Sequence, residues 1–248
     1  MTLYIIAALV TLVFTIVLTV AGLGAAFILV PVYLVLGVEM HSAQATALLL
    51  NAIAMAFACV RYIPAKLVDF RIAVPIVIVA TILSPLGAYT SSFVPVTTLK
   101  WMFVAFLVFA GAMMLWYRPK PHELAGRREL LGVGAGVGGA AGFLGGMLGV
   151  GGGNFVVPAL VWLGLDAKRA AGTTAFVVVF ASFTGFLGQA SVAGIDLTLL
   201  VWTAGASIIG ALIGSWLMHR KLQAAQVKTS IGVLLFFIAA TMAWRLVA

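Results

Sequence analysis

The stretch Gly149-Val-Gly-Gly-Gly-Asn-Phe-Val-Val-Pro158 decides how this chain folds. It lies in a run, from Leu130 to Leu165, that contains no Asp, Glu, Lys or Arg. Four glycines and an asparagine in so apolar a run predict a broken helix, which a bilayer tolerates only where protein or a cavity surrounds the break. A weaker copy, Gly22-Leu-Gly-Ala-Ala-Phe-Ile-Leu-Val-Pro31, precedes it. Two interrupted apolar segments in corresponding halves indicate a transporter site.

The composition places the chain in a membrane. Of the 248 residues, 64% are hydrophobic and 8% are charged, and the mean hydropathy is +1.24. These values exclude a soluble domain and predict a polytopic membrane protein, with the lipid bilayer as its surroundings. The net charge of +8 comes from basic residues in short loops, so it indicates membrane topology and no nucleic-acid partner.

Charge-free runs predict the membrane segments, since about 20 apolar residues cross a bilayer as a helix. Most runs fit one helix, but the first and fifth are too long for one crossing. Each of these two predicts a long helix, a break at the glycines and a short helix. The runs are roughly residues 1–38, 40–60, 72–99, 101–117, 130–165, 170–195, 197–219 and 229–244.

The two halves are copies of one another. An offset of 127 residues aligns Gly22 with Gly149 and Pro31 with Pro158, and it continues without a gap through Asp69 with Asp196. The basic loops fall at different places in the two copies, which predicts that matching elements face opposite sides of the membrane. We expect a first repeat at 1–117, a cytoplasmic linker at 118–129 and a second repeat at 130–248.

The predicted fold is therefore an all-α polytopic membrane protein with two inverted repeats. Each repeat is a Gly-broken helical hairpin plus three transmembrane helices, which gives about 8 to 10 membrane segments in total. Because Lys and Arg mark the cytoplasmic side, both termini are expected outside. The expected location is the cytoplasmic (inner) membrane of a bacterium.

The two breaks are the candidate substrate site. A helix that restarts in an apolar setting presents unpaired N–H groups and the positive end of its dipole, which together bind anions. The alternative is that the glycines only permit close helix packing, but two clusters in register favour a site. Pro31 and Pro158 lie too deep to be first-turn prolines and are predicted to kink the short helices. The break residues assigned to the site are Gly22, Gly24, Ala25, Gly151, Gly152 and Gly153.

Polar side chains of the neighbouring segments complete this candidate site. Asn154, at the start of a short helix, either caps the helix or reaches the ligand. Ser and Thr in membrane helices often bond back to their own helix or bridge two helices. The remaining polar residues of these segments are therefore weaker candidates: Gln44, Ser182, Thr184 and Gln189. The second copy is richer in donors, so the substrate is expected nearer Gly151 to Asn154. The side chains assigned to the lining are Thr46, Asn51, Asn154, Thr173 and Thr174.

Other chemistry is not expected. Every Asp, Glu, Lys and Arg lies at the boundary of an apolar run, so the spans contain no carboxylate or amine for a proton relay. Asp69 and Asp196 are predicted to be helix N-caps. No nucleotide-binding, metal-binding or hydrolase motif is present, so no cofactor, metal or enzymatic activity is expected.

These residues resemble those of the sulfite exporter TauE/SafE-like family of membrane transporters. The resemblance covers essentially the whole chain and rests on Gly149 to Pro158, on Ala170-Ala-Gly-Thr-Thr-Ala175 and on Gly194-Ile-Asp196. It implies transport of sulfur-containing anions such as sulfite, thiosulfate or sulfoacetate. The first half departs from the pattern, with Ala25 and Ala26 where glycines are expected and Ala47 where the second copy has Thr174.

The sequence thus favours a secondary transporter of a small anion, working by alternating access between the two halves. A passive anion channel and a carrier of another organic anion remain alternatives, as does a scaffold or assembly factor that transports nothing. The sequence leaves open the direction of transport, the coupling ion (H+ or Na+) and the oligomeric state.

Overall fold

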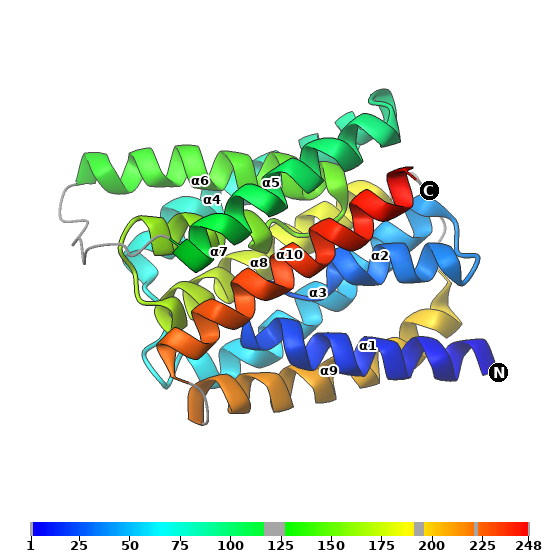
Figure 1. Ribbon diagram of the computed structural model, residues 1–248, viewed down its shortest axis with the longest axis horizontal. Coiled ribbons are helices and arrows are strands. Elements are labelled where there is room, and N and C mark those ends of the chain that lie inside the picture. Colours follow the sequence, from blue (N-terminus) through cyan, green and yellow to red (C-terminus); the bar gives the residue numbers. More distant parts are fainter. Residues whose placement is uncertain (1, 117–126, 191–195, 221–222, 248) are drawn as a thin grey trace.

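The protein is a bundle of α-helices in the part that the computed structural model describes, residues 2–116, 127–190, 196–220 and 223–247 (Figure 1). One short 3-10 turn, Ser91–Phe93, follows the fourth helix. In chain order the helices are α1 Thr2–Val20, α2 Ala26–Val35, α3 Met40–Tyr62, α4 Phe70–Thr90, α5 Val96–Trp116, α6 Arg127–Leu148, α7 Gly153–Trp162, α8 Ala167–Ala190, α9 Leu197–Arg220 and α10 Ala224–Val247.

The predicted all-α membrane fold is confirmed. Within the described residues, five helices are long and apolar enough to cross a bilayer: α3, α4, α6, α8 and α9. Both predicted breaks are also present, because α1 ends at Val20 before α2 begins, and α6 ends at Leu148 before α7 begins. The predicted linker at 118–129 lies mostly outside the described residues, and its last residues belong to α6, which begins at Arg127.

The helix boundaries repeat at the offset that aligns the two sequence copies. Residues 26–35 and 153–162 form α2 and α7, and α4 and α9 begin at Phe70 and Leu197, again 127 residues apart. The packing repeats as well. Helix α1 packs against α9, and its counterpart α6 packs against α4, the counterpart of α9. Helix α3 packs against its own counterpart α8, and α5 against α10.

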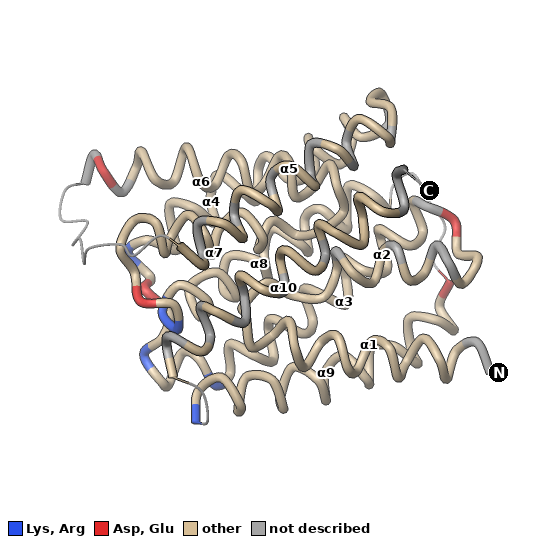
Figure 2. Tube along the Cα trace, viewed as in Figure 1, with Lys and Arg blue, Asp and Glu red and all other residues tan. Residues whose placement is uncertain are grey.

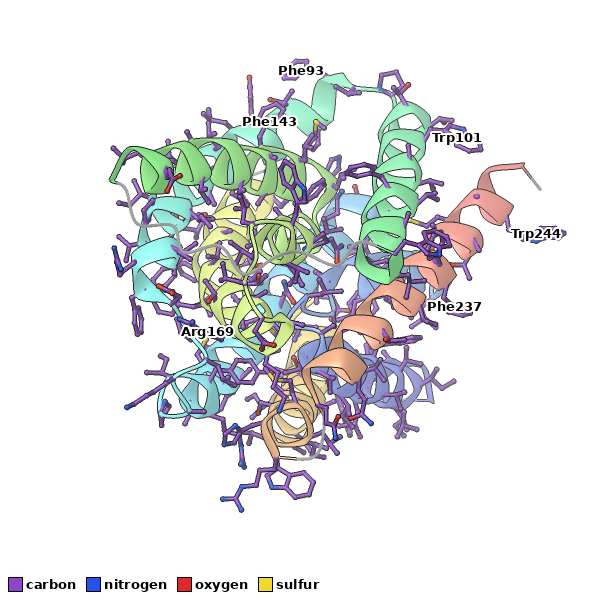
Figure 3. All side chains as sticks on the ribbon, turned by 60° about the vertical axis from the view of Figure 1, so that its left-hand side comes forward. Phe93, Trp101, Phe143, Arg169, Phe237 and Trp244 are labelled. Carbon is purple, nitrogen blue, oxygen red and sulfur yellow. The ribbon has the colours of Figure 1, made fainter. Side chains whose placement is uncertain are left out.

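Helices α3 and α8 form the centre of the bundle. In the most apolar 18-residue stretch of each helix, 72% of the residues of α3 and 61% of those of α8 are buried, against 39% or less in α4, α6 and α9. The two helices run in opposite directions, because His41 at the start of α3 bonds to Gln189 at the end of α8. Large apolar side chains elsewhere face outward, as Trp101 and Trp244 do in Figure 3, and in a bilayer they face lipid.

The Lys and Arg residues that are drawn in blue in Figure 2 gather at one end of the bundle, which we call the basic end. They come from the α3–α4 connection, the start of α8 and the end of α9. Both chain termini lie toward the opposite end (Figure 1). The residues that define the basic end are Arg61, Lys66, Arg71, Lys168, Arg169 and Arg220.

Aspartates cap two helices, as the sequence predicts. Asp69 precedes α4, and its carboxylate accepts a hydrogen bond from the N–H of Arg71 at 3.1 Å. Asp196 precedes α9, and its carboxylate accepts from Thr198 at 2.9 Å. A carboxylate at this position satisfies N–H groups that the first turn leaves without helix partners.

Candidate functional site

The two breaks share one backbone geometry, set by left-handed glycines. Gly22 and Gly149 have φ values of +68° and +69°, and Gly24 and Gly151 have +75° and +73°. Residues with a Cβ rarely adopt these angles, which explains why glycine stands at both positions in both copies. The sequence shows that the glycines repeat, and the structure shows that the positive φ angles of the backbone at these positions favour glycine.

Hydrogen bonds at the breaks also repeat. The N–H of Leu23 bonds to the Leu18 carbonyl at 3.2 Å, and the N–H of Val150 bonds to the Gly145 carbonyl at 2.9 Å. These bonds end α1 and α6 in the same way, by satisfying a carbonyl of the last turn.

Both short helices restart directly after their breaks. The N–H of Leu29 bonds to the Ala25 carbonyl at 3.0 Å, and the N–H of Val156 bonds to the Gly152 carbonyl at 3.3 Å. The first N–H groups of each helix therefore have no carbonyl partner inside it, and the positive end of each helix dipole faces the break. This is the backbone arrangement that binds anions.

The two breaks differ in the sign of φ at one position. Gly152, the residue before α7, is left-handed with φ of +75°. Its counterpart Ala25 is not, because Lys66 is the one non-glycine residue with positive φ in the described part of the chain. The departure of the first half from the glycine pattern is thus a real difference in backbone conformation.

The two breaks meet inside the bundle, with Asn51 between them. The Asn51 side chain lies directly against the Cα of Gly24, and a Cβ added at Gly151 would be 2.6 Å from Asn51 Nδ2. A Cβ at Gly153, the first residue of α7, would be 2.5 Å from the Leu23 carbonyl oxygen of the other break. Glycine is required here because backbone and side chains from both halves share one small volume.

Ser182 of α8 belongs to the same centre. Asn51 Nδ2 donates to Ser182 Oγ at 2.9 Å, and both side chains are buried. Ser182 Oγ also lies against the Cα of Gly151. We call the group formed by Gly24, Asn51, Gly151 and Ser182 the central cluster.

Several buried polar atoms around these helices have no hydrogen-bond partner. Both amide atoms of Asn154, in the first turn of α7, are fully buried and unpartnered. Asn51 keeps one unpartnered atom, Oδ1, in the central cluster. An unsatisfied buried polar group costs about 1–3 kcal/mol, so such a concentration calls for a structural or functional explanation. The others on α3 and α8 are Gln44 Oε1, Thr46 Oγ1, Thr174 Oγ1 and Gln189 Nε2.

Some predicted site residues lie against other helices. Gly22 is in contact with the Ala171 carbonyl of α8, and Gly152 with the Ala141 carbonyl of α6. These two glycines permit close packing, which is the alternative role considered for them. Thr173 is fully buried, and its Oγ1 accepts a hydrogen bond from the N–H of Asp69 at 3.0 Å, next to the basic end.

The short-helix prolines occupy equivalent positions. Pro158 is buried in the sixth position of α7, and Pro31 occupies the sixth position of α2. The predicted kink stays a prediction.

Sequence reasoning undervalued Ser182. The 127-residue offset pairs it with Met55, so the repeat offers no support for it. A serine in a membrane helix also more often bonds back to its own helix. Only the three-dimensional approach of α3 to α8 shows that Asn51 needs it as an acceptor.

The described residues contain no group of three His, Cys, Asp or Glu side chains that could hold a metal ion. The described buried polar side chains are hydroxyls and amides. The centre therefore offers neutral hydroxyl and amide groups together with helix N-termini, and a helix N-terminus favours an anion.

Comparison with known proteins gives one result. The family model described as "Sulfite exporter TauE/SafE" matches residues 6–242, nearly the whole chain. Neither the curated proteins nor the solved structures contain a match.

Proposed function

The chain belongs to the sulfite exporter TauE/SafE family, and we propose that it is a secondary transporter of a small anion, a sulfur oxyanion or an organosulfonate. Membership of this family, together with the apolar helices, makes it a multi-pass membrane protein that transports sulfur compounds. The proposal adds where the anion binds and how it crosses the bilayer.

The observation that carries the proposal is the meeting of two left-handed glycine breaks around Asn51. It joins two helix N-termini from opposite halves to buried amides and hydroxyls, several of which have no partner. Neutral donors in a water-excluded setting form strong hydrogen bonds to an oxyanion. Asn154 Nδ2 and the Ser182 hydroxyl are the proposed donors, with Asn51 holding Ser182 and with Thr46 and Thr174 beside them on α3 and α8.

Alternating access explains why these residues are buried. Residues 151–158 are all buried, so on this proposal an anion enters and leaves when the two halves move relative to each other. The 127-residue repeat of boundaries, φ angles and packing partners supports two inverted halves that exchange conformations. On this proposal the basic end faces the cytoplasm of a bacterium and both termini lie outside.

Flux measurements in proteoliposomes test the proposal. Labelled sulfite, thiosulfate and sulfoacetate are offered with and without imposed H+ and Na+ gradients. We expect saturable uptake of at least one anion that responds to a gradient. Flux that neither saturates nor responds to any gradient would indicate a passive channel. No flux of any of the three would contradict the substrate class and favour a scaffold.

A further inference from the structure

We propose that Asp69, Arg169 and Thr173 form a junction that holds the basic end closed. This Asp69 junction rests on the proposed function, because it controls access to the site between the two halves. It assigns these three residues to gating, whereas the sequence assigned Thr173 to substrate binding.

Asp69 makes three bonds at once. One carboxylate oxygen caps α4, and the other accepts from Arg169 Nη2 at 2.9 Å. Its N–H donates to Thr173 Oγ1 at 3.0 Å. One residue of the first repeat is thereby attached to two residues of α8 in the second repeat.

The junction reaches from the surface to the interior. Arg169, labelled in Figure 3, is about half exposed at 52%, whereas Thr173, one helical turn further along α8, is fully buried. Between them, a Cβ at Gly172 would be 2.8 Å from both the Cβ and the carbonyl oxygen of Leu67. The chain from Leu67 to Asp69 therefore lies directly over the first turns of α8.

The repeat offset identifies the corresponding residues at the other end. Residues 127 positions from Asp69, Arg169 and Thr173 are Asp196, Ser42 and Thr46. Asp196 caps its helix just as Asp69 does. Ser42 carries no charge, however, and Thr46 Oγ1 is buried without a partner. The helix cap is common to both ends, but the uncharged Ser42 cannot replace the Arg169 guanidinium in an ion pair.

The described link between α3 and α8 at the opposite end is of another kind. His41 Nδ1 and Gln189 Oε1 lie 3.3 Å apart, at the long limit of a hydrogen bond, and Gln189 Nε2 is buried without a partner. In a protein whose open and closed states differ by a few kcal/mol, the ion pair and hydrogen bonds of Asp69 are enough to bias the population toward a closed basic end.

Cysteine labelling tests the junction without any substrate. In a Cys59→Ala background, Ala170→Cys reports access at the basic end and Ala43→Cys reports access at the equivalent position of the other end; both alanines are fully buried. The purified, reconstituted protein is labelled with a membrane-impermeant maleimide. Asp69→Asn is the test variant, because asparagine caps a helix as well as aspartate does but cannot form the ion pair. Asp196→Asn is the matched control.

We expect Asp69→Asn to label about two- to fivefold faster at position 170, the range that an exposed ion pair supports, and no faster at position 43. Arg169→Gln is expected to have the same effect, and the double variant to label no faster than either single one. Equal rates in Asp69→Asn and its parent would overturn the junction. An equal acceleration by Asp196→Asn would also overturn it, because general loosening would then be the cause. Absence of anion flux in the parent would contradict the proposed function but leave the labelling result readable.

Discussion

The two broken hairpins share the same backbone geometry but are held in place by different contacts. In the first, Thr11 of α1 and Tyr33 of α2 are hydrogen-bonded at 3.0 Å, and the Tyr62 hydroxyl donates to the Thr19 carbonyl at 2.8 Å, just before the break. These side chains are fully buried. Hydroxyl groups thus connect α1, α2 and α3 around the first break.

The second hairpin has no such side chains at the equivalent positions. Thr11 and Thr19 correspond to Gly138 and Gly146. A Cβ at Gly138 would be 2.8 Å from the Ile76 carbonyl oxygen, and Gly146 is in contact with the Ser84 carbonyl oxygen. Here the backbones of α6 and α4 touch directly, as small residues allow in membrane helices.

The difference lies in what holds each hairpin. In the first, the hydroxyls of Thr11, Tyr33 and Tyr62 are hydrogen-bonded, although Thr15 Oγ1 and Thr19 Oγ1 of α1 have no partner. The second uses glycine packing, and Asn154, with an unpartnered amide, stands where the first has Phe27. One duplicated backbone geometry is thus supported by side-chain hydrogen bonds in one half and by glycine packing in the other.

The largest effect is expected from Asn154→Leu. Leucine removes two unpartnered amide atoms from a buried position, so we expect a folded protein that is about 1 kcal/mol more stable and transports no anion. Flux in proteoliposomes and thermal unfolding in detergent measure the two effects. A variant that still transports, or one that is markedly less stable, would show that the amide serves the fold.

The glycine packing of the second hairpin is tested by Gly146→Ala. Its Cβ meets the Ser84 backbone, which cannot move aside as a flexible side chain would, so we expect a loss of about 1–3 kcal/mol in the free energy of unfolding. Gly136→Ala, on the same helix, is the control, since a Cβ there meets nothing within 4 Å. It is expected to raise stability by up to about 1 kcal/mol. Equal effects would contradict the assigned packing.

The hydrogen-bonded first hairpin is tested by Tyr62→Phe, with a smaller expected effect. The Thr19 carbonyl also accepts from the N–H of Gly22 at 2.9 Å, so it keeps one partner. We expect a loss of about 0.5–1.5 kcal/mol, measured by unfolding in detergent. Tyr89→Phe, at a side chain that is 63% exposed, should change little. If both substitutions had the same effect, the Tyr62 bond would contribute nothing specific.

The sequence predicted the helices, the breaks and the aspartate caps because each has a local cause. Apolar length defines a membrane helix, glycine permits φ near +70°, and Asp69 caps the helix that follows it. The hydrogen bonds of Thr173 and Ser182 were not predictable in this way. Thr173 bonds to Asp69 and Ser182 bonds to Asn51, and each partner lies in the other half of the chain. Spacing along the sequence does not show which residues of the two halves come close together.

The sequence also treated the break glycines as one class. The structure separates Gly24 and Gly151, which surround Asn51, from Gly22 and Gly152, which pack against carbonyls of α8 and α6. Both groups require glycine, for different reasons. The pattern alone could not distinguish them, because a glycine looks the same in the sequence whether it makes room for a buried side chain or for the backbone of another helix.

Ligand-induced stabilisation tests the central claim most directly. Sulfite, thiosulfate and sulfoacetate are added to the purified protein, to Ser182→Ala and to Thr184→Ala, whose parent hydroxyl bonds back to the Phe180 carbonyl at 3.0 Å. We predict that at least one anion, at about a hundredfold excess over its Kd, stabilises the protein and Thr184→Ala by about 2.7 kcal/mol. Ser182→Ala should show a much smaller shift at the same concentration. Equal shifts in all three proteins would contradict an anion site where the two breaks meet.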